Sequence, residues 1–324
     1  MRSKKKIVAG ALALVSAVCI GYYHSELRNR PAPPELEAKA SNKERVRAAM
    51  PHFQQTNMTK LPSIETPLNL IILELIRRAD SGDSMAACRL AAEYQRCDFV
   101  DRQIKHLDDV TGSGALEGKL TSVTLTSENG QLYGGVQHCQ GVQPSAPSRI
   151  PELLRRAALG GNPAAMRAYV SGSGFSTDTT LEDLDELDAY KKLAPEMARR
   201  SIESGDGAVL LSLASAYQPE NNLGARPLLA QVVSTDITQS LSLFSVAKQE
   251  MVNQGRGEGR LFDFVDRQVS NLEFRASASQ RAEAERRAQQ LQTTMKQVRF
   301  PPDSDVAFIS RASTRAIRSA DCSE

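Results

Sequence analysis

Cysteine is the residue type whose number and spacing in this chain most directly suggest chemistry. Cys19 lies in an N-terminal apolar run, which leaves four cysteines: Cys88, Cys97, Cys139 and Cys322. If Cys88 and Cys97 share one helix, they are about 13 Å apart along its axis, which is too far for a disulfide. We therefore prefer the pair Cys97–Cys139, which would clamp the long segment between them, with Cys88–Cys322 as the second pair.

A zinc site is the competing interpretation of these cysteines. The chain has four histidines, of which only His138 neighbours a cysteine; the others are His24, His52 and His106. There is no C-x-x-C spacing and no histidine pair at ligand spacing. The sequence therefore predicts structural disulfides, with neither a metal nor a cofactor.

Three stretches resemble catalytic or phosphate-binding motifs but do not meet their requirements. VSGSGF (residues 170–175) lacks the first glycine of a nucleophile elbow and follows no predicted strand. QGRGEGR (254–260) follows a predicted helix, whereas a phosphate-binding loop follows a strand. In EDLDELDAY (182–190) the carboxylates have helical spacing, and we expect Leu181, Leu184 and Leu187 to face the core. No glutamate pair suited to glycoside hydrolysis is singled out, so we predict no catalytic residue.

One six-residue sequence, DFVDRQ, occurs twice, at 98–103 and at 263–268. Asp98 and Asp263 suit the N-cap of a helix, and the next aspartate of each copy suits its first turn. Apolar residues follow at helical spacing in both copies. We interpret the repeat as two helix starts rather than as a duplicated acidic active element.

The N-terminus has the pattern of a targeting segment. Arg2 and Lys4–Lys6 precede an uncharged apolar run from Ile7 to Tyr23. A cleaved signal peptide remains possible, but the length of the run and its terminal tyrosines favour an uncleaved signal anchor. Either one places the rest of the chain outside the cytoplasm, where disulfides form. We predict a bacterial envelope protein on the periplasmic side, held to the inner membrane by residues 7–23.

Composition favours an all-α fold. The 324 residues include no tryptophan and only 5% aromatics, and Ala, Leu, Arg, Gln and Glu are abundant. The formal net charge is only +2, which gives no indication of nucleic-acid binding. A core of Ala and Leu suits closely packed helix pairs.

Three segments share a pattern of helix, tight turn and helix. The glycine of each turn suits the left-handed position that closes the first helix, and the next residue suits the N-cap of the second. These turn residues are Gly82 and Asp83, Gly161 and Asn162, and Gly205 and Asp206.

The first two turns lie in the pattern A-x-x-G-(D/N)-x-x-A, from Ala79 to Ala86 and from Ala158 to Ala165. This pattern resembles the Sel-one-like repeats, which are related to the tetratricopeptide repeat. The third copy departs from it, with Ile202 and Val209 in place of the alanines, and the three hairpins cover under a third of the folded region. The resemblance implies stacked α-hairpins that bind proteins, and it transfers no ligand site.

The remaining sequence completes the predicted domain organisation. A linker (24–66) follows the anchor (1–23), and a helical-repeat domain covers 67–300 with a tail at 301–324. An insertion (98–149) follows the first hairpin, and its LTSVTLTSENGQL segment is either a small β-hairpin or a loop held by Cys139. A divergent fourth hairpin precedes a long helix over 276–298, and the tail is expected to be ordered only if Cys322 is tied down.

The predicted function is binding. We expect an envelope-anchored short α-solenoid, without catalysis, that offers a concave face to a protein or peptide partner. Two alternatives remain: a hydrolase that acts on the cell wall, and an envelope inhibitor or immunity-type protein. Convergent carboxylates in a cleft would favour the hydrolase.

Overall fold

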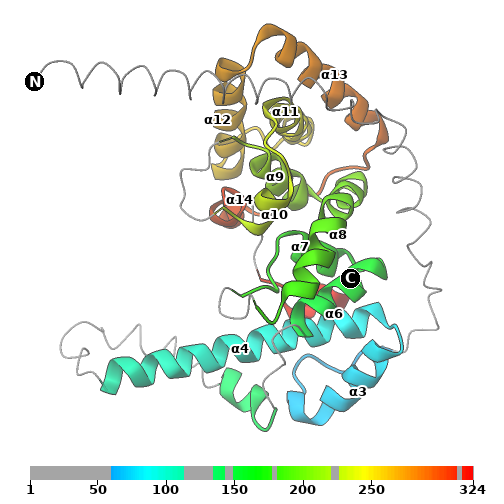
Figure 1. Cartoon of the computed structure of the whole chain (residues 1–324), viewed down its shortest axis with the longest axis vertical. Coiled ribbons are helices and arrows are strands. Elements are labelled where there is room, and N and C mark those ends of the chain that lie inside the picture. The colour runs from blue at the N-terminus through cyan, green and yellow to red at the C-terminus, as the bar shows by residue number, and fades with distance from the viewer. Residues whose placement is uncertain are drawn as a thin grey trace, which may run out of the picture. The chain divides into compact units, whose positions relative to one another are not determined.

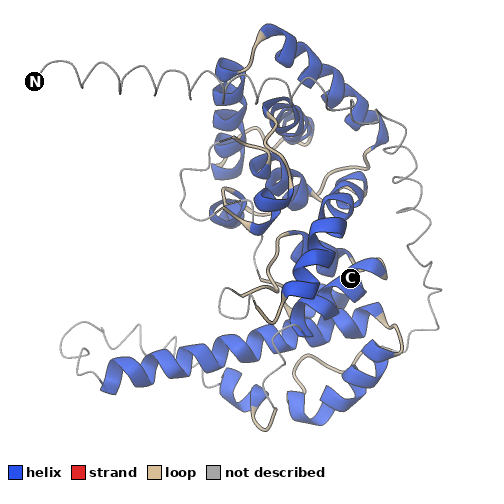
Figure 2. Ribbon diagram, viewed as in Figure 1, coloured by secondary structure: helices blue, strands red, loops and turns tan. Residues whose placement is uncertain are grey.

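Helices make up nearly all of the regular structure (Figure 2). The computed structural model describes residues 60–112, 134–142, 149–176, 181–219, 226–311 and 316–323. Within these ranges there is no β-strand beyond one isolated bridge between Asp206 and Arg299. The described residues belong to one unit, Phe53–Glu324. The all-α prediction is therefore confirmed.

Several predicted features lie outside the described residues. They are the anchor (1–23), the linker up to residue 59, and the segment expected to form either a β-hairpin or a loop at 120–130. In the part that is described, no helix has both the length and the apolar character needed to cross a bilayer.

Three hairpins close at the three glycine turns. Their helix pairs are α3 (Leu68–Asp80) with α4 (Ser84–Gly112), α6 (Arg149–Leu159) with α7 (Pro163–Val170), and α8 (Leu184–Glu203) with α9 (Gly207–Ala216). Gly82, Gly161 and Gly205 have φ angles of 94°, 88° and 89°. This left-handed conformation costs an L-residue about 1–2 kcal/mol and costs glycine almost nothing.

All three corners use the same hydrogen bonds. At the first, Gly82 N–H donates to Ala79 O and Asp83 N–H donates to Arg78 O, which is the Schellman arrangement. Asp83 then accepts from the amides of Met85 and Ala86 and so caps α4. Asp206 caps α9 with two such bonds, and Asn162 caps α7 by accepting from the amide of Ala165. The corner therefore ends one helix and begins the next with only three residues between them.

The hairpins pack in chain order through small buried residues. α4 packs on α6, α7 on α8, and α9 on α11 (Ile237–Asn253). The alanines that flank the first two turns are buried, and the larger Ile202 and Val209 are buried at the third: Ala79, Ala86, Ala158, Ala165, Ile202 and Val209. Figure 1 shows consecutive helices packed side by side. The short side chains of the four alanines let the helices of the first two pairs approach closely.

The predicted fourth pair is α11 with α12 (Arg260–Arg275), preceded by the short α10 (Leu228–Val232). α13 (Ala278–Thr294) then packs on α11. It begins at a capping box formed by Ser277 and Gln280. α13 is shorter than the helix predicted over 276–298, because the chain leaves the helix at Met295 and turns back.

The residues after α13 form what we call the returning segment (295–311 and 316–323). Its first part runs beside the third corner, where Lys296 N–H donates to Glu203 O and Arg299 N–H donates to Gly205 O. It continues through η2 (Asp303–Asp305) and α14 (Val306–Ile309), which packs on α9. Its last part, η3 (Ser319–Ser323), packs on α4 and α7. The tail therefore belongs to the fold.

Two sequence-based predictions about local structure are wrong. α4 runs unbroken through Asp98, so this residue caps no helix; in the second DFVDRQ copy the N-cap is Gly259, and Asp263 lies in the first turn of α12. Leu181 and Leu184 face solvent, with Leu181 80% exposed. The buried side chains of that stretch are instead Asp183 and Tyr190.

Candidate functional site

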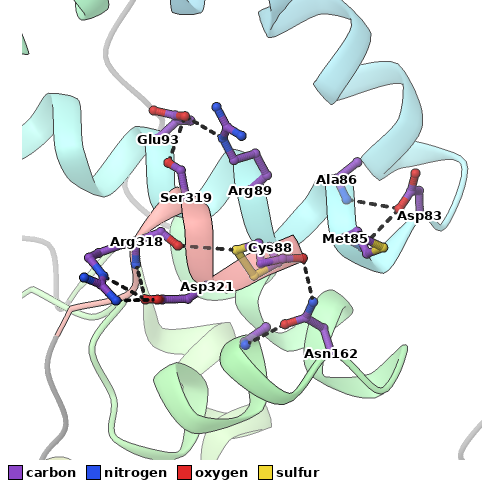
Figure 3. Close-up of a disulfide and its surroundings, with 12 residues drawn as sticks. Asp83, Met85, Ala86, Cys88, Arg89, Glu93, Asn162, Arg318, Ser319 and Asp321 are labelled. Atoms are coloured by element: carbon purple, nitrogen blue, oxygen red, sulfur yellow. Dashed lines mark hydrogen bonds and ion pairs between the residues drawn. A yellow bond between two sulfur atoms is a disulfide. The ribbon is translucent and has the colours of Figure 1, made fainter. Parts of the chain in front are cut away.

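A buried polar cluster joins three distant parts of the chain at Glu93. The Glu93 side chain is 0% exposed and lies on α4. Its Oε1 lies 2.6 Å from Arg89 Nε and accepts a hydrogen bond from the Ser319 hydroxyl at 2.8 Å. Its Oε2 lies 2.8 Å from His138 Nε2. Figure 3 shows Glu93, Arg89 and Ser319 converging where the C-terminal segment crosses α4.

The electrostatics of the cluster favour the ionised carboxylate. Burial favours the neutral acid, but the hydrogen bond from His138, the charge of Arg89 and the Ser319 hydroxyl together hold the pKa of Glu93 below its ordinary value. Because an ionised carboxylate only accepts hydrogen bonds, His138 Nε2 must carry a proton. Arg89 Nη2 is buried and has no hydrogen-bond partner among the described residues. The buried charge of Arg89 is therefore stabilised mainly by its ion pair with Glu93.

Two disulfides flank the cluster and fasten the same segments. Cys88 is bonded to Cys322 and Cys97 to Cys139, each pair with Cα atoms 5.6 Å apart. These are the pairings preferred from the sequence, and Cys88 and Cys97 do share one helix. Two segments are thus each attached to α4 at two points. Residues 134–142 are attached through His138 and Cys139, and residues 316–323 through Ser319 and Cys322.

The geometry of the cluster suits anchoring rather than nucleophilic catalysis. In a serine hydrolase the imidazole must contact the hydroxyl in order to take its proton. Here Glu93 stands between the two, and its separate oxygens contact His138 and Ser319. The arrangement therefore holds the segments in place and leaves the serine unactivated.

The remaining predicted site residues are structural. Asn162 caps α7, and its Nδ2 donates to Cys322 O at 3.4 Å, which ties the second corner to the C-terminal segment. Asp206 caps α9 and pairs with Arg167 at 2.9 Å. Across the described ranges, no group of three or more His, Cys, Asp or Glu side chains could hold a metal ion.

The stretches that resemble catalytic motifs are inter-helix turns or pairing sites. Residues 170–175 close α7, with Gly172 in the left-handed region. Arg256 in the 254–260 turn donates to the carbonyls of Phe300 and Pro301. In the acidic stretch at 182–190, Glu186 forms a two-point ion pair with Arg155, with both hydrogen bonds 2.8 Å long.

Beside the Glu93 cluster lies an open groove of about 1210 Å³. One wall is the face of α4 that carries Gln95, Arg96, Phe99 and Arg102; the others are the loop 173–176, the residues 316–320 of the returning segment, and Ile64, Glu65 and Ile150. Gln95 Nε2 donates to Ser173 O at 2.9 Å and links two walls. The groove could not be recognised in the sequence, because residues more than two hundred positions apart form it.

Comparison of the chain with models of known protein families, with curated proteins and with solved structures gives no match.

Proposed function

We propose that this chain is an exported, non-catalytic helical-repeat protein that binds a protein or peptide partner in the groove along α4. In this proposal residues 7–23 hold it to the periplasmic face of the bacterial inner membrane. The basic residues before this apolar run support export, and two disulfides are typical of an oxidising compartment.

The observation that carries the proposal is the groove itself. Its α4 wall presents the half-exposed ring of Phe99 between two exposed arginines. Aromatic and arginine side chains are the types that most often dominate binding energy at protein interfaces. Disulfides at Cys88 and Cys97 also restrain α4, because they join it to the segments that carry Cys322 and Cys139.

Site-specific photo-crosslinking in intact cells tests the proposal. A photoreactive phenylalanine analogue is placed at Phe99 or, as control, at Phe274, which is 92% exposed on α12 and outside the groove. We expect a discrete product from position 99 that position 274 does not give and that Arg96→Glu/Arg102→Glu abolishes. The same products from both positions, or none from position 99, would refute the groove as the binding site.

The location is tested separately with a thiol reagent that does not cross the inner membrane. We expect Cys88, Cys97, Cys139 and Cys322 to react only after a reductant is added. Labelling of these cysteines only after cell lysis would contradict export.

A further inference from the structure

The α4 wall of the groove has the side chains of a site for an acidic ligand. Arg96, Phe99 and Arg102 follow one another along one face of the helix, and both arginines are exposed. Arg102 is six positions after Arg96, which places it about 9 Å farther along the helix axis. Neither guanidinium has an ion-pair partner among the residues whose positions are described.

The second copy of DFVDRQ shows that this exposure is not dictated by the local sequence. Phe264, the counterpart of Phe99, is 6% exposed and packs edge-on against Phe244. Phe99 has the same flanking residues and is 55% exposed. The fold therefore covers the ring in one copy and leaves it open beside the groove in the other.

The groove is lined by both charged and apolar side chains. Three arginines and two carboxylates, those of Glu65 and Asp98, line the groove. One of the arginines, Arg318, already forms an ion pair with Asp321 at 2.8 Å. Apolar side chains on the other walls come from Ile64, Ile150, Phe175 and Ile317. Apolar side chains beside two arginines that lack an ion-pair partner among the described residues fit a ligand that brings both carboxylates and an apolar side chain.

We propose that the groove binds an acidic peptide segment of the partner protein, whose carboxylates pair with Arg96 and Arg102 and whose apolar side chain packs on Phe99. The proposal rests on the proposed binding function and specifies its partner. Arginine pairs with carboxylates through two parallel hydrogen bonds, which adds orientation to attraction. In an extended peptide, carboxylates two residues apart lie on the same face, about 7 Å from each other, and the long arginine side chains can reach both of them from backbone positions about 9 Å apart along α4.

The returning segment prepares the groove for such a ligand. Residues 316–320 form one wall, and this wall is held to α4 by the Cys88–Cys322 disulfide and by the Ser319–Glu93 hydrogen bond. A wall that is fixed in advance loses little conformational freedom on binding, which increases affinity. The oxidised protein should therefore bind more tightly than the reduced protein.

Selection from a library of random peptides displayed on phage tests the proposal without a known partner. The bait is the full chain, purified oxidised in mild detergent, and the counter-selection bait is Arg96→Glu/Arg102→Glu. We expect the enriched peptides to contain at least two carboxylates next to Leu, Ile, Met or an aromatic residue. Enrichment of basic or uncharged peptides, or no enrichment over the variant, would overturn the proposal.

The repeated sequence supplies a matched control for the affinity measurement. Arg102→Glu should weaken an enriched peptide at least about tenfold, since it replaces an attraction with a repulsion. Arg267→Glu makes the same change in the same six-residue sequence outside the groove and should have no effect. Equal loss in both variants would overturn the proposal, as would retention of binding by Phe99→Ala.

The two proposals fail differently. If the peptide selection fails while crosslinking from Phe99 still captures a discrete partner, then groove binding stands and the acidic partner is wrong. If crosslinking from Phe99 also fails, then the binding function itself is wrong. Circular dichroism of each variant checks that it is folded.

Discussion

Replacing Glu93 with glutamine removes the negative charge that faces Arg89 inside the protein while keeping the side chain's shape. Arg89 would then stay buried with a positive charge and with Nη2 already lacking a partner among the described residues. Removing one partner of a buried ion pair costs about 3–5 kcal/mol. Glutamine can still accept the hydrogen bond from Ser319, so we expect a loss near the lower end, about 3 kcal/mol.

The assay is urea unfolding of the oxidised protein, with the midpoint as the measured quantity. With a slope of about 3 kcal/mol per molar urea, the expected loss shifts the midpoint down by about 1 M. Glu283→Gln is the control, because Glu283 pairs with arginines too, Arg286 and Arg287, but at the protein surface. Exposed pairs contribute little, and a shift for Glu93→Gln no larger than that of the control would refute the reasoning.

A second variant and the pH dependence sharpen the test. Arg89→Met added to Glu93→Gln should restore part of the lost stability, because it removes the uncompensated charge. The fold lowers the pKa of Glu93 below its ordinary value of 4.5. Its contribution to stability is therefore fully present above pH 4.5 and is lost as the pH falls through the depressed value. The wild type and Glu93→Gln should converge in that acidic range.

Three further comparisons use thermal or urea unfolding. Gly161→Ala should lower the free energy of unfolding by about 1–2 kcal/mol through its left-handed φ alone, because the added Cβ meets nothing within 4 Å. Gly205→Ala should lower it by about 3 kcal/mol or more, because the added Cβ would collide with a carbonyl of the returning segment. Equal costs would contradict that contact. Replacing Cys97 and Cys139 with serine should lower the free energy of unfolding by up to about 4 kcal/mol, because the disulfide has a sequence separation of 42. This difference between wild type and variant should disappear when both are measured in a reductant. Tyr190→Phe should lower the free energy of unfolding by about 1 kcal/mol, because the buried Tyr190 hydroxyl donates a 2.6 Å hydrogen bond. Tyr169→Phe should leave it unchanged, because the Tyr169 hydroxyl has no hydrogen-bond partner in the described structure. A larger loss for Tyr169→Phe than for Tyr190→Phe would contradict this difference between the two hydroxyls.

The corners were predictable because their causes are local. A glycine that tolerates positive φ and an Asp or Asn that caps the next helix are adjacent in the sequence, and no distant contact is needed to recognise them. The predicted helix start at Asp98 failed for the opposite reason. An aspartate is compatible with a helix interior when the rest of the helix is held by packing and by disulfides, as α4 is.

The Glu93 cluster and the groove could not be read from the sequence. Only the spacing of Arg89 and Glu93, four residues apart on one helix, is a local signal, and such pairs are usually exposed. His138 and Ser319 lie 45 and 226 positions from Glu93, and their docking is what buries the pair. The cysteines give the nearest indirect clue, because Cys139 and Cys322 adjoin the two segments that meet at Glu93.

The path of the returning segment has a consequence for how the protein comes apart. It passes the third corner at Arg299, meets the second at Asn162 through Cys322 O, and is bonded to the first hairpin at Cys88. Arrays of hairpins that touch only their neighbours fray from either end, one unit at a time. Here the C-terminal residues connect all three hairpins, so no terminal hairpin can unfold without breaking these contacts. We therefore expect the hairpins to unfold together in one cooperative transition.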